Sequence, residues 1–209
     1  YIIRKGLFMG IKNNSKHING KLLDFGCGNK PYESLFNVTE YVGLDIVESG
    51  YPDEKSAEVF YDGKKIPFND NTFDSVLASE VFEHIFNPDE ALLELNRVLK
   101  KRGNILITVP FVWFEHEIPY DFFRYTQFSL KKMFYDSGFE IERLDWMEGY
   151  FGTVGYQLNR MAAYLPFKPK DIHHGIMGYL LFPILLFTKI FSGLFSIFFH
   201  RLEVKIKYT

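Results

Sequence analysis

The sequence has 209 residues, of which 47% are hydrophobic: enough to bury one sizeable core, but too short for two full domains. The formal net charge of −2, without a long run of Lys and Arg, excludes the strongly basic surface typical of nucleic-acid-binding proteins. Cys27 is the single cysteine, which excludes an intrachain disulfide and favours a reducing compartment such as the cytoplasm. The first ten residues lack the long apolar core and small-residue cleavage site of a signal peptide.

Five short apolar or β-rich runs, each ending at Gly, Asp, Ser or Pro, predict five strands. They span residues 21–25, 41–46, 58–61, 73–78 and 104–109. Before the fifth run, Asn87 is a suitable N-cap, Pro88 fits the first helical position, and an apolar face repeats at helical spacing until Gly103. A strand–helix–strand order predicts a parallel strand pair.

The second half of the chain predicts two helical regions and two further strands. A helix is expected from Thr126 to Ser137, ended by Gly138, with a strand in residues 139–147. Residues 176–199 form a nearly unbroken apolar stretch. Apolar and charged residues then alternate over residues 202–208, which predicts a last strand.

The alternating order of elements predicts an α/β fold with a doubly wound sheet, in which ligands bind at the carboxyl ends of the strands. Acidic residues gather at that expected edge. Asp24, Asp45, Asp62 and the Ser79–Glu80 pair each fall at the end of a strand. For Asp62, followed by Gly63, an ordinary Asp-Gly turn is an equal alternative.

The stretch LLDFGCGNKPY predicts a strand that runs into a tight glycine turn. Gly26 and Gly28 supply half of a dinucleotide-binding pattern, but Pro31 stands where its third glycine is due. A carboxylate at Asp24 would repel a pyrophosphate on the following helix. The turn therefore favours a cationic ligand, and Asp45 is placed to accept the hydroxyls of a ribose.

The segments LLDFGCGNKPY, YVGLDI, YDGKKIPFNDNTFDSVLASEVFEHI and NRVLKKRGNILITVP resemble, in order and spacing, the class I S-adenosylmethionine-dependent methyltransferases of the small-molecule type. The loop stretch PYDFFRYT is similar to one in the methyltransferases of surface-polysaccharide gene clusters. The resemblance covers about residues 20–145. It implies a Rossmann-like seven-stranded sheet whose last strand, from Leu202, is antiparallel.

On this basis residues 1–209 are expected to form a single methyltransferase domain. Its parts would be the cofactor-binding core 20–110, an acceptor loop 111–126, an apolar helical insertion at about 150–200 and the last strand 202–208.

The resemblance implies S-adenosylmethionine as cofactor and assigns its contacts. Asp24, Gly26 and Gly28 would hold the methionine end, and Asp45 the ribose. Asp62 and Gly63 would face the adenine, and Ser79 would line the cofactor. Cys27 and Ile46 complete the set as cofactor-binding neighbours.

Two histidines are candidates for the general base that a hydroxyl acceptor needs. His84 follows the fourth strand, and the alternative is a structural histidine bonded to a neighbouring carbonyl. His116 lies in the aromatic and charged loop WFEHEIPYDFFRYT. The alternative for this loop is a flap that packs over the core, with Arg124 paired to Asp121. Alternation along an extended run argues against a metal site in Glu115–Glu117, and no metal is expected.

The apolar stretch 176–199 is long enough to cross a bilayer, but a following strand that joins the sheet argues for a helix lying in the membrane plane or buried. The alternatives are a surface for a lipid or a lipid-linked acceptor, a helical pair packed on the domain, or a homodimer contact. Peripheral membrane association is therefore expected alongside a cytoplasmic location.

These observations predict a methyltransferase in polysaccharide biosynthesis that acts on a small, sugar-like or lipid-linked hydroxyl. Two alternatives stay open. One is a quinone or polyprenyl-phenol methyltransferase, and the other is a cofactor-binding module without catalysis.

Overall fold

A computed structural model describes residues 2–47, 55–147, 149–164 and 176–207. By its contacts the chain divides into two compact units. One comprises residues 7–145, and the other comprises residues 1–6 and 146–209. Whether both units act as the single domain expected from the sequence stays a prediction.

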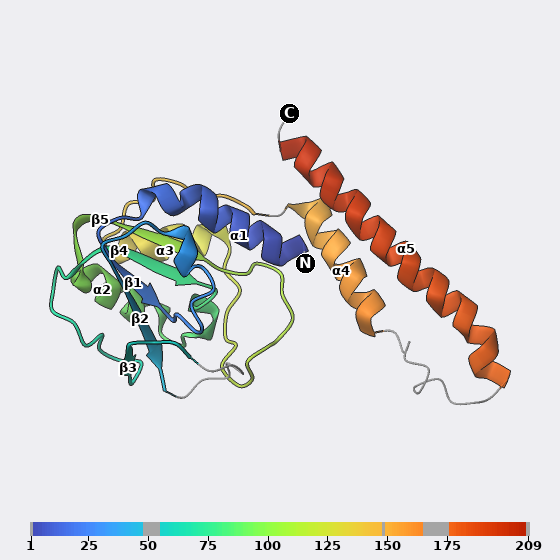
Figure 1. Cartoon of the computed structure of the whole chain (residues 1–209), viewed down its shortest axis with the longest axis horizontal. Helices are drawn as coiled ribbons and strands as arrows, with labels where there is room; N and C mark the ends of the chain where they lie inside the picture. Colours follow the sequence, from blue (N-terminus) through green and yellow to red (C-terminus); the bar gives the residue numbers. More distant parts are fainter. Residues whose placement is uncertain (1, 48–54, 148, 165–175, 208–209) are drawn as a thin grey trace. The chain divides into compact units, whose positions relative to one another are not determined.

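The larger unit is an α/β fold built on five strands (Figure 1). The strands are β1 Lys21–Phe25, β2 Glu40–Ile46, β3 Val59–Tyr61, β4 Phe73–Ser79 and β5 Leu99–Thr108. The helices are α1 Ile2–Asn14, which begins in the other unit, α2 Pro88–Val98 and α3 Gln127–Asp136. Three 3-10 turns, Ser15–His17, Glu33–Leu35 and Phe82–His84, complete the set. The sequence predicted all five strands, α2 and α3, but not α1.

All neighbouring strands in the sheet are parallel, in the order β3-β2-β1-β4-β5. The order reverses direction on either side of β1, as in a doubly wound fold. In the register, Asp24 lies beside Gly43 and Asp45 beside Phe60, so the strand ends that carry these carboxylates meet at one edge.

Buried apolar residues cover both faces of the sheet. One cluster joins Leu23, Phe25 and Val76 to the inner face of α2 and to partly buried residues of α3. The other cluster packs Leu22, Leu77 and Ile18 under Tyr32 and Phe36. Alternate residues of β1 thus enter opposite clusters, which explains why this strand reads as a continuous apolar run.

Local signals fix the helix boundaries of this unit. Thr126 caps α3 by accepting a hydrogen bond from the Ser129 N–H, and Ser129 bonds back to the Thr126 N–H. Gly138 follows the helix with a φ of 80°, a conformation that glycine adopts without strain. The helix predicted at 126–137 is therefore confirmed to within a residue at each end.

Two predicted strands are wrong. Residues 139–147 form no strand: Phe139 packs against the core, and the charged residues that follow are exposed or half-buried and join no ladder. Residues 202–207 are the last turns of a helix, not an antiparallel strand. No Pro or Gly interrupts the chain between residues 194 and 207, so the helix continues through the alternating stretch. The described sheet has five strands, all parallel, instead of seven.

The second unit contains a pair of packed helices, α4 Tyr150–Tyr164 and α5 Ile176–Lys207. Small residues mediate the packing. A Cβ on Gly155 would lie 2.9 Å from the carbonyl oxygen of Ser196, and the side chains of Ser192 and Ser196 are buried. The ring of Phe151 stacks on that of Phe199, with centroids 5.8 Å apart. Ser192 and Ser196 of α5 therefore face inward.

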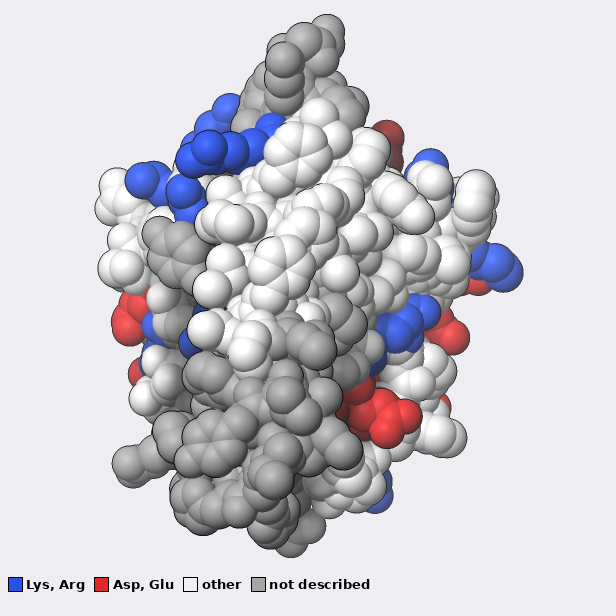
Figure 2. All heavy atoms as spheres, turned by 90° about the vertical axis from the view of Figure 1, so that its right-hand side faces the viewer, with Lys and Arg blue, Asp and Glu red and all other residues white. Residues whose placement is uncertain are grey.

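The outer face of α5 is apolar. Exposed large hydrophobic residues recur along it: Leu186, Phe187, Ile190, Phe191, Leu194, Ile197 and Phe198. Figure 2 shows a broad band of uncharged side chains on this side of the molecule, with Lys and Arg side chains at its margins. Among the described residues, no helix combines the length and apolarity needed to cross a bilayer.

Candidate active site

The glycine turn after β1 brings together the first group of predicted site residues. Gly26 and Gly28 have φ angles of 69° and 49°, which residues with a side chain rarely adopt. The Gly26 N–H donates to the carbonyl oxygen of Leu44, which ties the turn to β2. A Cβ on Gly26 would lie 2.6 Å from two carbons of Val81, so the turn also lies against the segment that follows β4. Cys27 is buried beneath it.

Asp24 lies almost fully buried at the end of β1. Its Oδ2 accepts a hydrogen bond of 2.5 Å from the Tyr41 hydroxyl. Burial raises the pKa of Asp24 to about 7, while the Tyr41 bond and the charge of Lys30 act in the opposite direction. A cation bound beside Asp24 would therefore lower its pKa and favour the ionised carboxylate. The contribution of Tyr41 has no sequence signature.

Asp45 closes the same turn from β2. Its Oδ2 accepts a 2.9 Å bond from the Gly28 N–H, which fixes the carboxylate against the glycine turn. Its Oδ1 accepts from the Ile46 N–H and forms an ion pair of 2.8 Å with Lys55. The structure therefore brings Gly28, Asp45 and Ile46 together, and Lys55 is a neighbour that the sequence did not indicate.

The remaining predicted cofactor residues lie at the ends of β3 and β4. Asp62 is exposed, and its Oδ1 accepts from the Lys64 N–H in the local turn that was the alternative interpretation. A Cβ on Gly63 would lie 3.8 Å from the Ile46 side chain, so this turn adjoins the end of β2. Ser79 exchanges a 3.0 Å hydrogen bond with Thr108.

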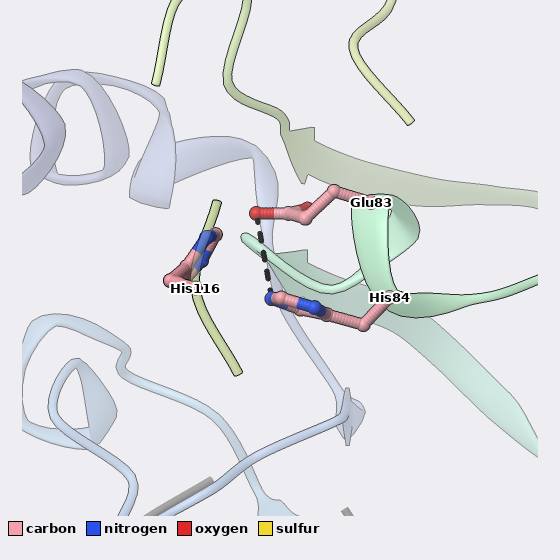
Figure 3. Close-up of side chains that lie close together, drawn as sticks. All are labelled: Glu83, His84 and His116. Atoms are coloured by element: carbon pink, nitrogen blue, oxygen red, sulfur yellow. Dashed lines mark ion pairs between the residues drawn. The ribbon is translucent and has the colours of Figure 1, made fainter. Parts of the chain in front are cut away.

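Both candidate histidines come from segments that hydrogen bonds hold together. His84 ends the 3-10 turn Phe82–His84, whereas His116 belongs to the loop after β5. The Tyr125 hydroxyl donates to the carbonyl oxygen of Phe82, and the Phe122 N–H donates to that of Glu83. These bonds bring residues more than thirty positions apart into one cluster (Figure 3).

His84 is oriented by the loop. Its Nδ1 lies 2.9 Å from the carbonyl oxygen of Tyr120. Because a carbonyl can only accept, Nδ1 carries the proton and Nε2 keeps its lone pair. The bond to a neighbouring carbonyl that a purely structural histidine would make is therefore present. This bond leaves Nε2 available as a proton acceptor.

His116 is oriented by a carboxylate. Its Nδ1 lies 3.1 Å from Oδ2 of Asp121, which also accepts from the His116 N–H. Arg124 binds both oxygens of Asp121, at 2.6 and 2.8 Å, and this pairing lowers the pKa of Asp121. The ionised carboxylate favours the tautomer of His116 that is protonated on Nδ1. The Arg124–Asp121 pair of the flap alternative is thus confirmed.

The two imidazoles meet edge to face, with ring centroids 4.8 Å apart. The carboxyl group of Glu83 completes the cluster: it is fully buried, and Oε1 lies 3.9 Å from Nε2 of His84. Burial and the neighbouring Glu80 raise the pKa of Glu83, and burial likewise raises that of Glu80. Neither carboxyl group was predicted as a site residue.

Comparison with known proteins identifies the core of this unit. Residues 23–107 match the model of a methyltransferase domain family, Methyltransf_11. A ubiquinone/menaquinone biosynthesis C-methyltransferase of Geotalea daltonii is 27% identical over 169 residues, covering 66% of this chain and 71% of that protein. This segment is an S-adenosylmethionine-dependent methyltransferase domain. Its cofactor is S-adenosylmethionine, as the sequence predicted.

Further matches are to two uncharacterised proteins and to solved structures that share the fold. Two proteins of Methanocaldococcus jannaschii are 36% and 32% identical, and the matches span 40% and 47% of their lengths, less than half of each relative. An S-adenosylmethionine-dependent methyltransferase from Mesorhizobium loti shares the fold, with a TM-score of 0.54 at 12% identity over 69% of this chain and 86% of that one. A methyltransferase structure from Bacillus halodurans has a TM-score of 0.51 at 19% identity over 78% and 84%. The Rossmann-like class of the sheet is thereby confirmed.

Proposed function

We propose that the protein transfers a methyl group from S-adenosylmethionine to a hydroxyl of a small, sugar-like or lipid-linked acceptor. One observation carries the proposal: two imidazoles lie together, each with Nδ1 held by an oxygen acceptor, which leaves both Nε2 atoms as proton acceptors. His84 comes three residues after Val81, whose side chain lies against Gly26 of the glycine turn. A base in this place suits an acceptor that must lose a proton.

In this proposal the cofactor is held by the strand-end carboxylates. Asp24 would bind the ammonium of the methionine end, with Gly26, Cys27 and Gly28 lining it. The ribose hydroxyls would bind Asp45 beside Ile46, where they compete with Lys55 for Oδ1. Asp62 and Gly63 would face the adenine, and Ser79 would line the cofactor.

The reaction is a displacement at the methyl carbon. The acceptor oxygen forms the new O–C bond while the C–S bond breaks, and its electron pair remains on sulfur, which becomes the neutral thioether of S-adenosylhomocysteine. The hydroxyl proton passes to Nε2 of His84 or His116. Aromatic and charged residues of the loop 111–126 would surround the acceptor.

The relatives favour a second candidate. Two matched proteins are ubiquinone/menaquinone biosynthesis C-methyltransferases, from Geotalea daltonii and Blochmanniella pennsylvanica. A quinone precursor is a flat acceptor that the aromatic loop 111–126 would also suit. Here methylation occurs on a ring carbon. An imidazole would remove the proton from the phenol, the ring carbon would take the methyl group, and the proton on that carbon would then pass to the phenol oxygen as the ring regains aromaticity.

The apolar face of α5 fits an acceptor with a lipid tail. We assign this face to a lipid surface, because the small and polar residues of the helix pack inward against α4 while the large apolar ones point outward. A homodimer through the same face is the alternative that a test must separate.

The test is turnover with a panel of acceptors: free sugars, polyprenyl-linked sugars and demethylated quinols. We expect S-adenosylhomocysteine to form with one class. His84→Gln and His116→Gln should each lower turnover about a hundredfold or more, with cofactor affinity unchanged. His17→Gln, an exposed histidine on another segment, is the matched control. Product formation with none of the acceptors would favour the binding module without catalysis.

A further inference from the structure

We propose that Glu83, His84 and His116 form a binding site for a divalent transition-metal cation. One ligand atom from each residue lies within 4.8 Å of the other two. Figure 3 shows the carboxyl group of Glu83 and the two imidazole rings pointing toward a common centre from two segments of the chain. The role proposed for the cation below rests on the proposed function, whereas the site itself rests on this geometry.

The carboxyl group of Glu83 is the observation that points to a ligand. Its side chain has no exposed surface, and neither carboxyl oxygen has a hydrogen-bond partner among the described residues. A buried carboxyl group without a hydrogen bond is costly, and coordination to a metal is one of the ways in which proteins satisfy it. Oε1 of the neighbouring Glu80 is likewise buried without a partner.

The two histidines are held as metal ligands usually are. Each uses Nδ1 for an oxygen acceptor, the Tyr120 carbonyl for His84 and the Asp121 carboxylate for His116. Such outer partners fix the tautomer in which Nε2 is free to coordinate, and a carboxylate partner raises the basicity of the ligand. Arg124 in turn holds Asp121 by two bonds.

The local charge also favours a cation. Glu80, Glu83 and Asp121 bring three carboxyl groups to the cluster, and Nε2 of His84 lies 3.9 Å from a carboxylate oxygen of Glu117. Arg124 is the guanidinium that faces them, and both of its NH groups already bind Asp121. A divalent ion bound here would stabilise the ionised forms of the buried Glu80 and Glu83 carboxyl groups, which burial alone disfavours.

The donor set selects the kind of ion. Two imidazole nitrogens and one carboxylate suit Zn²⁺, Mn²⁺ or Fe²⁺ and leave coordination positions open, whereas Mg²⁺ and Ca²⁺ prefer oxygen ligands. In a tetrahedral site the ligand atoms lie about 3.4 Å apart, given metal–ligand bonds of about 2.1 Å. The three side chains would therefore draw together by roughly 1 Å on binding, within the reach of small torsional changes. When bound, the ion would occupy the Nε2 lone pairs of both histidines, so the imidazoles would no longer serve as bases. The ion itself would lower the pKa of an acceptor hydroxyl that coordinates to it, and the proton of that hydroxyl would pass to water.

Direct binding tests the site without reference to activity. Untagged protein, dialysed against a chelator and then freed of it, is titrated with Zn²⁺, Mn²⁺, Co²⁺ and Mg²⁺ by calorimetry, and Co²⁺ binding is also followed by its visible absorption. We expect one transition-metal ion per chain and a much weaker response to Mg²⁺. Glu83→Gln and His116→Gln should each weaken binding by on the order of a hundredfold, whereas His17→Gln should not.

The outcomes separate the inference from the proposed function. Absence of binding, or binding that Glu83→Gln and His116→Gln leave unchanged, overturns the metal site. If methyl transfer then persists in the presence of a chelator, the proposed function still holds. Binding lost in both variants supports the site even if no hydroxyl acceptor is methylated. Because Glu83 is buried, its variant counts only if circular dichroism shows the wild-type fold; otherwise the variant of the half-buried His116 decides.

Discussion

Asp24 is a buried carboxyl group whose charge depends on what lies next to it. In the absence of ligand, its pKa of about 7 exceeds the value of an unfolded chain, because burial disfavours the ionised form. Its contribution to stability is therefore fully present below pH 4 and is lost as the pH rises through 7. An ammonium bound beside it would lower this pKa, so binding and ionisation are coupled.

From this coupling we expect the affinity for S-adenosylhomocysteine to rise by about twentyfold between pH 5.5 and 7.5, because the Asp24 carboxyl group of the unliganded protein becomes ionised over this range and binding no longer has to ionise it. Calorimetric titration at three pH values measures the effect. Asp24→Asn should bind more weakly and show a flat profile over the same range. An identical rise in the variant would assign the pH dependence to another group.

At the same scale, individual residues explain why the catalytic cluster was predicted only in part. His84 and His116 stand out in the sequence because they are histidines near strand ends. Glu83 did not, because nothing in a single sequence shows that a carboxyl group is fully buried beside an imidazole that folding brings from 33 positions away. The backbone bonds between Phe122, Phe123 and Glu83 create this neighbourhood, and they have no sequence signature.

Among the elements, predictions based on local signals were confirmed and those based on weak alternation were not. β1 was predicted with its exact bounds, since a continuous apolar run ending at a glycine turn has few other interpretations. Residues 202–207 alternate like a strand, yet they continue a helix that began at Ile176. Because no strand after α5 returns to the sheet within the described residues, the topology does not require α5 to lie in the membrane plane.

The apolar face of α5 leads us to predict that the protein binds lipid membranes through this helix. Phe187 and Phe191 are 68% and 47% exposed, and burying such a side chain contributes about 1.5–3 kcal/mol. Replacing both by Ser should therefore release the protein from phosphatidylglycerol-containing liposomes in a flotation assay. Leu93→Ser, which alters an equally exposed apolar residue on α2, should not.

Light scattering of the same variants distinguishes the alternative. If the wild-type protein is a dimer that does not bind liposomes and the double variant is a monomer, the face of α5 is a subunit contact and the assignment to lipid is wrong. Cofactor affinity should remain unchanged in either case, because the residues proposed to bind the cofactor all lie in the unit formed by residues 7–145.

For the whole molecule, the α/β unit contains every residue proposed to bind the cofactor, and both buried clusters of its sheet support their positions. Ligand binding to the native state adds directly to the free energy of unfolding of the part that binds. Thermal unfolding of the complete chain therefore reports which nucleotide ligand the strand-end carboxylates accept.

We expect S-adenosylhomocysteine, at a concentration of about one hundred times its Kd, to add about 2.7 kcal/mol and to raise Tm by roughly 5–10 °C. NADH should leave Tm unchanged, because its pyrophosphate would meet the Asp24 carboxyl group at the glycine turn and offers no ammonium in return. Asp45→Asn should lose most of the shift, since it weakens a charged acceptor for the ribose. Asp136→Asn, at the exposed end of α3, should retain the shift. Equal stabilisation by NADH and S-adenosylhomocysteine would show that the carboxylates at this sheet edge do not select the cofactor by charge.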